Sequence, residues 1–503
     1  MSSELHLKKK KGPRVRFAPS PTGPMHIGNT RTALFNFLFA RHNQGSFILR
    51  IEDTDTERSE KKWEKNIIES LKWLGLLWDE GPNLQKIKKD SQSYIGEYGP
   101  YRQSERKEIY KRYIQKLYDD DYLYWCFCTK EELQAQKEEL MSRGEPPRYT
   151  GHCRNLSKSQ IKKLKIEGKR GILRLKVPLK IIKFEDLIKG EIKFDSSLLG
   201  DIAIAKDFET PLYNFAVVID DYEMKITHVI RGEDHLSNTP KQIIFQDILN
   251  FPHPKYAHLP LILGPGRNKL SKRDAPLAIS DYKKAGYLPE ALINFLALLG
   301  WNPKNDQEIW SLEELIQNFS LKNIQKSPAI FNIEKLDWFN SYYIRQTPLE
   351  TLVDQVLPYI LDKIPGKEID REYLKKIIIL YQERLKKLSD FFDLADFFFK
   401  DKLEFDEKLL YWKNMTKNNI VNSLEKSKKI ISSIKDENFN KETIQELLIK
   451  EAEKEDDRGK LLWPLRVSLT GKSASPPPFD IIEILGKEKT IKRIDEAIKR
   501  LVD

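Results

Sequence analysis

Cysteine is scarce in this sequence, and long hydrophobic runs are missing. Only 3 of the 503 residues are cysteines, too few for a disulfide framework, which favours a reducing compartment. The longest apolar stretch, residues 291–301, is too short to cross a bilayer and predicts a buried helix. Residues 1–12 are polar and rich in lysine, without the apolar core of a signal peptide. We therefore expect a cytoplasmic protein with no membrane segment.

Two glycine-rich phosphate loops are missing as well. The turn after the first expected strand lacks the G-x-G-x-x-G of dinucleotide-binding folds. Residues 471–473 (GKS) match the end of a P-loop, but Arg466 occupies the position of its first glycine. If the chain binds a nucleotide, it does so through another motif.

The bulk composition predicts several folded domains and suits an anionic partner. The chain is longer than one domain of about 100–200 residues, and its 40% hydrophobic and 11% aromatic content supports packed cores. A net charge of +11 is compatible with nucleic acid. Because lysine is abundant throughout the chain, the net charge alone does not establish that the partner is a nucleic acid.

Alternating strand and helix patterns predict a parallel sheet with helical crossovers. The first elements are a strand at 14–18, a helix at 27–42, a strand at 47–51 and a helix at 58–74. After a helix at 104–118 and a strand at 122–128, charged helical sequence and short β-segments (172–177, 181–185 and 191–194) indicate an insertion. The alternation of strand and helix resumes with a strand at 227–231, a helix at 240–249 and a strand at 259–263. From about Trp310 onward the pattern is helical, without a recognisable strand.

The first strand–helix turn carries the sequence RFAPSPTGPMHIGN at residues 16–29. Its prolines and glycine predict a rigid turn at the carboxyl edge of the sheet, where ligands of open α/β folds bind. His26 and Asn29 are three residues apart at a helix start, so both can face one ligand, and the helix N-terminus favours phosphate. Gly28 lets a purine or ribose approach the backbone. The alternative is an ordinary capped helix with an incidental histidine.

A second motif is cationic: KLSKR at residues 269–273, which follows two glycines after an expected strand. Such a loop can close over a triphosphate and stabilise charge that builds on the α-phosphate. A lysine-rich loop in a lysine-rich chain is more often a solvated surface. Its position just after the returning parallel sheet favours the functional interpretation.

These two segments resemble the HIGH and KMSKS motifs of class I aminoacyl-tRNA synthetases. The chain is further similar to the bacterial glutamyl-tRNA synthetase family over nearly its whole length. The segments that carry this resemblance are RFAPSPTG at 16–23, LRIEDTD at 49–55, GPYRQS at 99–104 and VIRGEDHL at 229–236. Asn29 departs from the second histidine of the HIGH motif.

The resemblance implies a reaction in which the carboxylate of glutamate attacks the α-phosphate of ATP and the glutamyl group then passes to tRNA(Glu). Positioning and charge neutralisation suffice for this chemistry. The implied catalytic residues are His26, Lys269 and Lys272. The implied ATP site, with Mg²⁺ on the nucleotide, consists of Pro19, Gly28, Asn29, Lys272 and Arg273. The implied glutamate pocket consists of Arg16, Ala18, Ser20, Glu52, Tyr213 and Arg231.

The charges of the residues that the resemblance assigns to this pocket suit glutamate. Arginine suits the side-chain carboxylate of glutamate, and Glu52 suits its ammonium group. Arg16 lies within an apolar strand, where an unpaired cation would be costly. For Glu52 the alternative is a solvated strand end.

All three cysteines, Cys126, Cys128 and Cys153, fall within 28 residues of the expected insertion. This clustering predicts one structural Zn²⁺; the alternative is three reduced, partly buried thiols. Tyr149, His152 and Asn155 are near enough in sequence to supply a fourth ligand. Members of the family carry zinc here with Tyr or His completing the set, which favours Tyr149.

The resemblance also implies the domain organisation. We expect a Rossmann-like catalytic domain (1–108 and 214–268) split by an α+β acceptor-binding insertion (109–213). A KMSKS-loop and stem-contact region (269–345) and an all-α anticodon-binding domain (346–503) would follow, in a monomer. The alternatives are a glutaminyl-tRNA synthetase, whose family ends in β-barrels, and a non-catalytic tRNA-binding paralogue. Whether tRNA(Gln) is also charged stays open.

Overall fold

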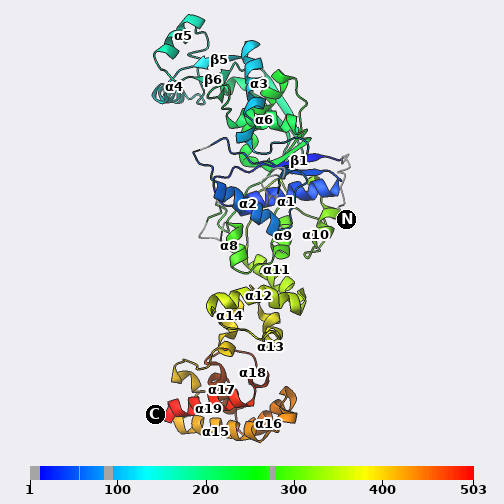
Figure 1. The fold of residues 1–503 in the computed structure, drawn as a ribbon, viewed down its shortest axis with the longest axis vertical. Coiled ribbons are helices and arrows are strands. Elements are labelled where there is room, and N and C mark those ends of the chain that lie inside the picture. Colours follow the sequence, from blue (N-terminus) through cyan, green and yellow to red (C-terminus); the bar gives the residue numbers. More distant parts are fainter. Residues whose placement is uncertain are drawn as a thin grey trace. The chain divides into compact units, whose positions relative to one another are not determined.

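A computed structural model describes residues 12–55, 57–83, 94–268, 270–271, 276 and 278–502. The chain divides into two compact units, residues 1–283 with 289–335 and residues 284–288 with 336–503 (Figure 1). Within the described ranges, no helix combines the length and hydrophobicity that crossing a membrane requires.

The first unit begins with the predicted strand–helix–strand. β1 (Arg14–Phe17) and β2 (Ser46–Leu49) are parallel, and α1 (Ile27–His42) packs against both. β2 is buried along its length, as expected for a parallel strand covered on both faces. The predicted bounds of the helix are confirmed, and those of the strands differ by one or two residues.

A four-stranded sheet has the order β10-β11-β7-β8. β10 (His228–Gly232), β11 (Lys255–Leu259) and β7 (Ile181–Asp186) run parallel, and β8 (Gly190–Asp195) closes an antiparallel hairpin with β7. β1 lies beside this sheet, because the Thr227 N–H donates to the Arg14 carbonyl at 2.9 Å. The hairpin, which the sequence places in the insertion, thus contributes a strand to the same sheet as β10.

The strand predicted at residues 259–263 is wrong. The main strand is β11, which ends at Leu259 because Pro260 has no N–H to continue the ladder. The short strand β12 (Ile262–Leu263) instead pairs in parallel with β13 (Ala329–Ile330). β13 also corrects the expectation that no strand follows Trp310; a two-residue strand leaves no periodic pattern.

The insertion contains a separate antiparallel sheet of order β5-β6-β9. Its strands are β5 (Leu123–Cys126), β6 (Ile172–Leu175) and β9 (Ile202–Ala205). The remaining elements of the unit are α2 (Lys61–Trp73), β3 (Gly81–Pro82), β4 (Tyr94–Ile95), α3 (Lys107–Asp119), α4 (Lys130–Ser142), α5 (Lys158–Ile166), α6 (Tyr213–Glu223), α7 (Thr239–Leu249), α9 (Pro289–Leu298) and α10 (Leu312–Asn318).

The second unit is helical throughout its described residues. A representative helix is α13 (Arg371–Tyr381), which begins where the Asp370 side chain accepts from the Glu372 N–H at 2.8 Å. Its buried side chains, Leu374, Ile377, Ile378 and Tyr381, recur every three or four residues on one face. The other helices, with α8 and α11 crossing the division between the units, are α8 (Ile279–Lys284), α11 (Ile333–Gln346), α12 (Leu349–Lys363), α14 (Asp390–Ala395), α15 (Lys417–Ser433), α16 (Lys441–Ala452), α17 (Gly459–Thr470), α18 (Pro478–Leu485) and α19 (Lys487–Val502).

Candidate active site and metal cluster

The turn between β1 and α1 places several of the predicted ligand-binding residues together. His26 is the N-cap of α1, and its Nδ1 accepts from the Asn29 N–H at 3.4 Å. A Cβ on Gly28 would lie 3.2 Å from the His26 ring, so the glycine leaves space for the imidazole. The histidine is exposed and stands at a helix N-terminus whose unpaired N–H groups favour an anion.

The segment after the cationic loop is joined to this turn. Ala278 forms an antiparallel bridge with His26, and the Ile279 N–H donates to the Met25 carbonyl at 2.9 Å. The predicted catalytic residues Lys269 and Lys272, like Arg273, lie outside the described residues. Two segments about 250 residues apart in the chain therefore meet at the start of α1, as a nucleotide site built from both would require.

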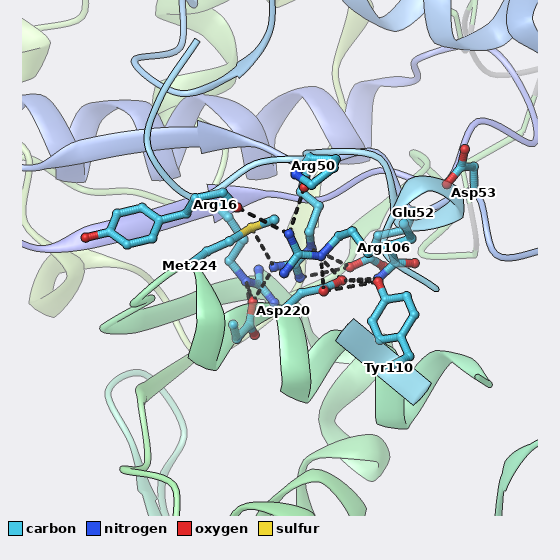
Figure 2. A network of polar contacts seen from close by, with 12 residues as sticks. Arg16, Arg50, Glu52, Asp53, Arg106, Tyr110, Asp220 and Met224 are labelled. Carbon is cyan, nitrogen blue, oxygen red and sulfur yellow. Dashed lines mark hydrogen bonds and ion pairs between the residues drawn. The ribbon is translucent and has the colours of Figure 1, made fainter. Parts of the chain in front are cut away.

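Buried arginines and carboxylates form a network beneath the turn (Figure 2). Asp221 accepts from Arg16 Nε at 3.2 Å and from Arg50 Nη1 at 2.7 Å. Arg50 Nη2 also donates to Glu52 Oε1 at 3.0 Å. Burial opposes the charge on Asp221, but Arg16 and Arg50 outweigh it and lower the pKa of this carboxyl.

A second carboxylate of α6 anchors the same network. Asp220 accepts from Arg106 Nε at 2.6 Å, from Gln103 Nε2 at 2.8 Å and from the Tyr110 hydroxyl at 2.9 Å. The pKa of Tyr110 is raised well above its ordinary value, by burial first and then by Asp220. These bonds satisfy a fully buried charge and fix the position of α6.

Glu52, predicted to meet the substrate ammonium, joins this group through Arg50. Its N–H donates to the Pro19 carbonyl at 3.0 Å, which ties it to the β1–α1 turn. Burial raises the pKa of its carboxyl, although Arg50 and Arg16 oppose the shift. Of the other two predicted pocket residues in the turn, Ala18 is partly buried and Ser20 is exposed.

Tyr213, the first residue of α6, connects the two predicted arginines. Its hydroxyl lies 3.2 Å from His235 Nδ1. Burial, with Glu52 as the next cause, raises its pKa to about 12, although Arg231 and Arg16 oppose the shift. The structure thus brings Arg16, Glu52, Tyr213 and Arg231 within electrostatic range of one another.

Arg231 projects from β10 and is 5% exposed. Its Nε donates to His258 Nε2 at 3.1 Å and its Nη2 to Thr239 Oγ1 at 2.8 Å. Nη1 is buried and has no hydrogen-bond partner among the described residues. A buried guanidinium bonded to neutral groups keeps its positive charge available for an anionic ligand.

Several residues of this network were not predicted from the sequence. They are Arg50, Gln103, Arg106, Tyr110, Asp186, Asp220, Asp221 and His258. One signal was available: Asp220 and Asp221 directly follow the apolar run 215–219 in what becomes α6. Two acids that interrupt a buried helix face require cationic or polar partners, but the sequence does not identify those partners.

The three cysteine sulfurs converge in the insertion, within 4.8 Å of one another. Cys128 and Cys153 Sγ are 3.6 Å apart, and the Tyr149 hydroxyl lies 3.4 Å from Cys126 Sγ and 3.7 Å from Cys128 Sγ. Sulfurs bound to one tetrahedral Zn²⁺ at about 2.3 Å would be about 3.8 Å apart. Among the described residues, no histidine nitrogen joins this group of ligand atoms, so Tyr149 rather than His152 fits the fourth position.

Comparisons with known proteins identify the family of the chain. Residues 13–338 match the family of tRNA synthetases class I (E and Q), catalytic domain, and residues 351–498 match an anticodon binding domain. Glutamate–tRNA ligase 1 of Caldicellulosiruptor saccharolyticus is 47% identical over 494 residues, 96% of this chain and 98% of that protein. Glutamate–tRNA ligase of Carboxydothermus hydrogenoformans is 45% identical over 491 residues, again 96% of this chain and 98% of that protein.

Solved structures extend the likeness to the fold. The crystal structure of a glutamate tRNA ligase from Elizabethkingia meningosepticum, in complex with its amino acid, has a TM-score of 0.84 at 38% identity. It covers 98% of this chain and is itself covered completely. A glutamate–tRNA synthetase from Elizabethkingia anophelis has a TM-score of 0.83 at 38% identity, with 97% of this chain and 100% of that chain covered.

Proposed function

This chain belongs to the glutamate–tRNA ligases, a group of class I tRNA synthetases, and on this premise we propose how it performs the reaction. It activates L-glutamate with ATP beside Arg16 and Arg231 and transfers the glutamyl group to tRNA(Glu). The 41–47% identity to proteins named glutamate–tRNA ligase favours this function over that of a glutaminyl-tRNA synthetase.

The buried, uncompensated charge of Arg231 carries the proposal for the amino acid. The guanidinium has neutral partners and an unpaired Nη1 among the described residues, so a side-chain carboxylate would supply the missing acceptor. Arg16, whose charge is compensated by Asp221, adds a second guanidinium that can donate hydrogen bonds, and Glu52 supplies a negative charge for the substrate ammonium. Glutamine would leave the arginine charge unbalanced, and burial makes that imbalance costly.

ATP, with its Mg²⁺, is a substrate that we place at the start of α1. The exposed His26, the helix N-terminus and the Gly28 turn support this position. Lys269, Lys272 and Arg273 would close over the phosphates, because the chain that follows them is anchored at His26 through Ala278. The protein neutralises the phosphate charge and aligns the two substrates, and the glutamate carboxylate itself is the nucleophile.

We also propose one structural Zn²⁺ held by Cys126, Cys128, Cys153 and Tyr149. The spacing of the sulfurs supports this set. The ion would cross-link β5 to the turn around Tyr149 and would take no part in the chemical reaction. Only three buried residues of the described chain, Tyr124, Cys126 and Cys153, form this cluster, and a metal contributes most to folding where the core is small.

For the tRNA, we propose that residues 109–213 bind the acceptor end, 269–345 contact the stem and 346–503 bind the anticodon. The anticodon-domain match at 351–498 supports the last assignment. The scarcity of cysteine supports a cytoplasmic enzyme, which we expect to act as a monomer.

The test is aminoacylation of tRNA(Glu) and tRNA(Gln) with labelled glutamate and labelled glutamine. We expect glutamate to be attached to tRNA(Glu) and glutamine to be rejected by about 10⁴-fold in kcat/KM. In Arg231→Gln, kcat/KM for glutamate should fall by about 10³-fold or more. Equal use of the two amino acids would refute the assignment, and absence of any ATP-dependent charging would indicate a non-catalytic paralogue.

A further inference from the structure

A buried chain of hydrogen bonds reaches Arg231 from the two neighbouring strands of its sheet. Asp186 Oδ2 lies 2.6 Å from His258 Nδ1, and His258 Nε2 accepts from Arg231 Nε at 3.1 Å. The side chains of Asp186 and His258 have no solvent exposure. The three residues come from adjacent strands, β7, β11 and β10, in which Arg231 is opposite His258.

The donors and acceptors at the two ends fix the state of the imidazole. Arginine can only donate, so His258 Nε2 must carry a lone pair. An ionised Asp186 can only accept, so Nδ1 must carry the proton. The neutral Nδ1–H tautomer is the form that satisfies both contacts; an imidazolium would direct an N–H at the Arg231 N–H. Burial and Arg231 lower the pKa of His258, in agreement with a neutral ring.

Asp186 is held as a carboxylate by its own backbone surroundings. Its Oδ1 accepts from the Ile188 N–H at 2.9 Å and the Lys189 N–H at 2.8 Å, and Oδ2 accepts from the His258 N–H at 3.1 Å. These bonds and the ring lower the pKa of its carboxyl against the opposing effect of burial. The negative charge is therefore stable at neutral pH.

The imidazole keeps the charge of Asp186 apart from the charge of Arg231. A carboxylate in direct contact with the guanidinium would compensate the positive charge that a substrate carboxylate needs. His258 and Thr239, which lies 3.1 Å from His258 Nε2, instead fix the guanidinium through neutral acceptors. Arg231 is thus oriented at both Nε and Nη2 while its charge stays available.

We propose that Asp186 and His258 are positioning residues that set glutamate affinity and selectivity by orienting Arg231. This inference rests on the proposed function, because it assumes that Arg231 receives the glutamate side chain. It also gives the β7–β8 hairpin of the insertion a direct link to the amino-acid pocket. A second contact joins the same two regions: Lys189, between β7 and β8, forms a salt bridge with Glu233, two residues beyond Arg231.

The key variant is Asp186→Asn, which keeps size and shape. Its amide would direct an N–H at His258 Nδ1, which turns the ring into the Nε2–H tautomer and sets a donor against Arg231. The same tautomer argument explains the effect of the Asp-to-Asn change in the serine-protease triad. We expect KM for glutamate to rise by about tenfold or more, with kcat and KM for ATP changed less than about twofold.

Two substitutions at His258 separate orientation from general damage. His258→Gln can keep an acceptor near Arg231, whereas His258→Leu removes it, so KM for glutamate should rise less in the first than in the second. Asp201→Asn is the matched control, because Asp201 is another buried carboxylate of the insertion and accepts from the Tyr124 hydroxyl at 2.7 Å. It should leave KM for glutamate unchanged.

The ring state is measured directly by ¹⁵N NMR of histidine-labelled enzyme, with His258 assigned by its loss in His258→Gln. The wild type should show the Nδ1–H tautomer and Asp186→Asn the Nε2–H tautomer. An Nε2–H ring in the wild type, or an unchanged KM for glutamate in Asp186→Asn, would overturn the inference. If the wild type fails to charge tRNA with glutamate, the proposed function fails instead, and the tautomer shows whether the hydrogen-bond chain is correct.

Discussion

The buried side chain of Arg16 is held by Asp221, whose Oδ1 lies 3.2 Å from Arg16 Nε. The partner comes from α6, and β1 and α6 are far apart in the sequence. This contact removes the problem that an unpaired cation would pose within β1. It also leaves the remaining guanidinium nitrogens of Arg16 oriented by a fixed partner, as a substrate-binding arginine requires.

The first prediction concerns the stability contributed by this carboxylate. Asp221→Asn leaves the buried Arg16 without its carboxylate partner and removes one of the carboxylates that Arg50 contacts, while Glu52 still pairs with Arg50. Breaking a buried pair of this kind costs about 3–5 kcal/mol. We expect the midpoint of urea unfolding of the first unit to fall, measured by the fluorescence of its tryptophans. Glu209→Gln, which removes the exposed Lys111–Glu209 pair, is the control and should have no resolvable effect. Equal midpoints for Asp221→Asn and the wild type would contradict the network described here.

The second prediction concerns acid stability. Arg16 and Arg50 hold the pKa of Asp221 below its ordinary value although burial opposes them. The carboxylate therefore stabilises the fold above the unfolded-state pKa of about 3.9, and this stabilisation is lost as pH falls through the lower folded-state pKa. Unfolding midpoints from about pH 6 down to about pH 2.5 should fall more steeply for the wild type than for Asp221→Asn. Glu52, whose pKa is shifted upward, is coupled to Asp221 and to the same arginines, so the comparison reports the two carboxyls together.

The third prediction concerns the cationic loop. Lys272→Ala should lower kcat for charging by about 10²-fold or more while KM for glutamate changes little, because the cation acts mainly in the transition state. Single-turnover formation of the adenylate is the direct measurement. Lys61→Ala, at an exposed position at the start of α2, controls for the loss of a positive charge. An unchanged rate of adenylate formation would remove Lys272 from the mechanism.

The fourth prediction concerns the metal. Protein purified without chelator should contain about one zinc per chain, and Cys128→Ser should lose it. Tyr149→Phe removes the phenol oxygen and should weaken zinc retention during competition with a chelator, whereas His152→Ala, at an exposed position, should not. Both Cys128→Ser and Tyr149→Phe should weaken tRNA charging more than ATP binding, since the cluster is separate from His26. Metal-free protein with full activity would exclude the site.

The sequence by itself determined the local elements and the motifs. The bounds of α1 follow from its apolar pattern and its capping histidine, and both are set by neighbouring residues. The concentration of cysteines likewise predicted a cluster, because three ligands within 28 residues meet without distant pairing.

Only the tertiary structure decided which distant residues meet. Asp221 pairs with Arg16 across 205 positions and His258 with Asp186 across 72, and no periodicity in the sequence records such pairings. Asp186 directly follows the strand predicted at 181–185 in the insertion, and its role arises because β7 pairs with β11. The closeness of the Tyr149 hydroxyl to Cys126 and Cys128 likewise depends on where the turn places its side chain. Local pattern fixes which face of an element is buried, but the order of strands in a sheet decides which polar groups share that buried space, and there each charge requires its partner.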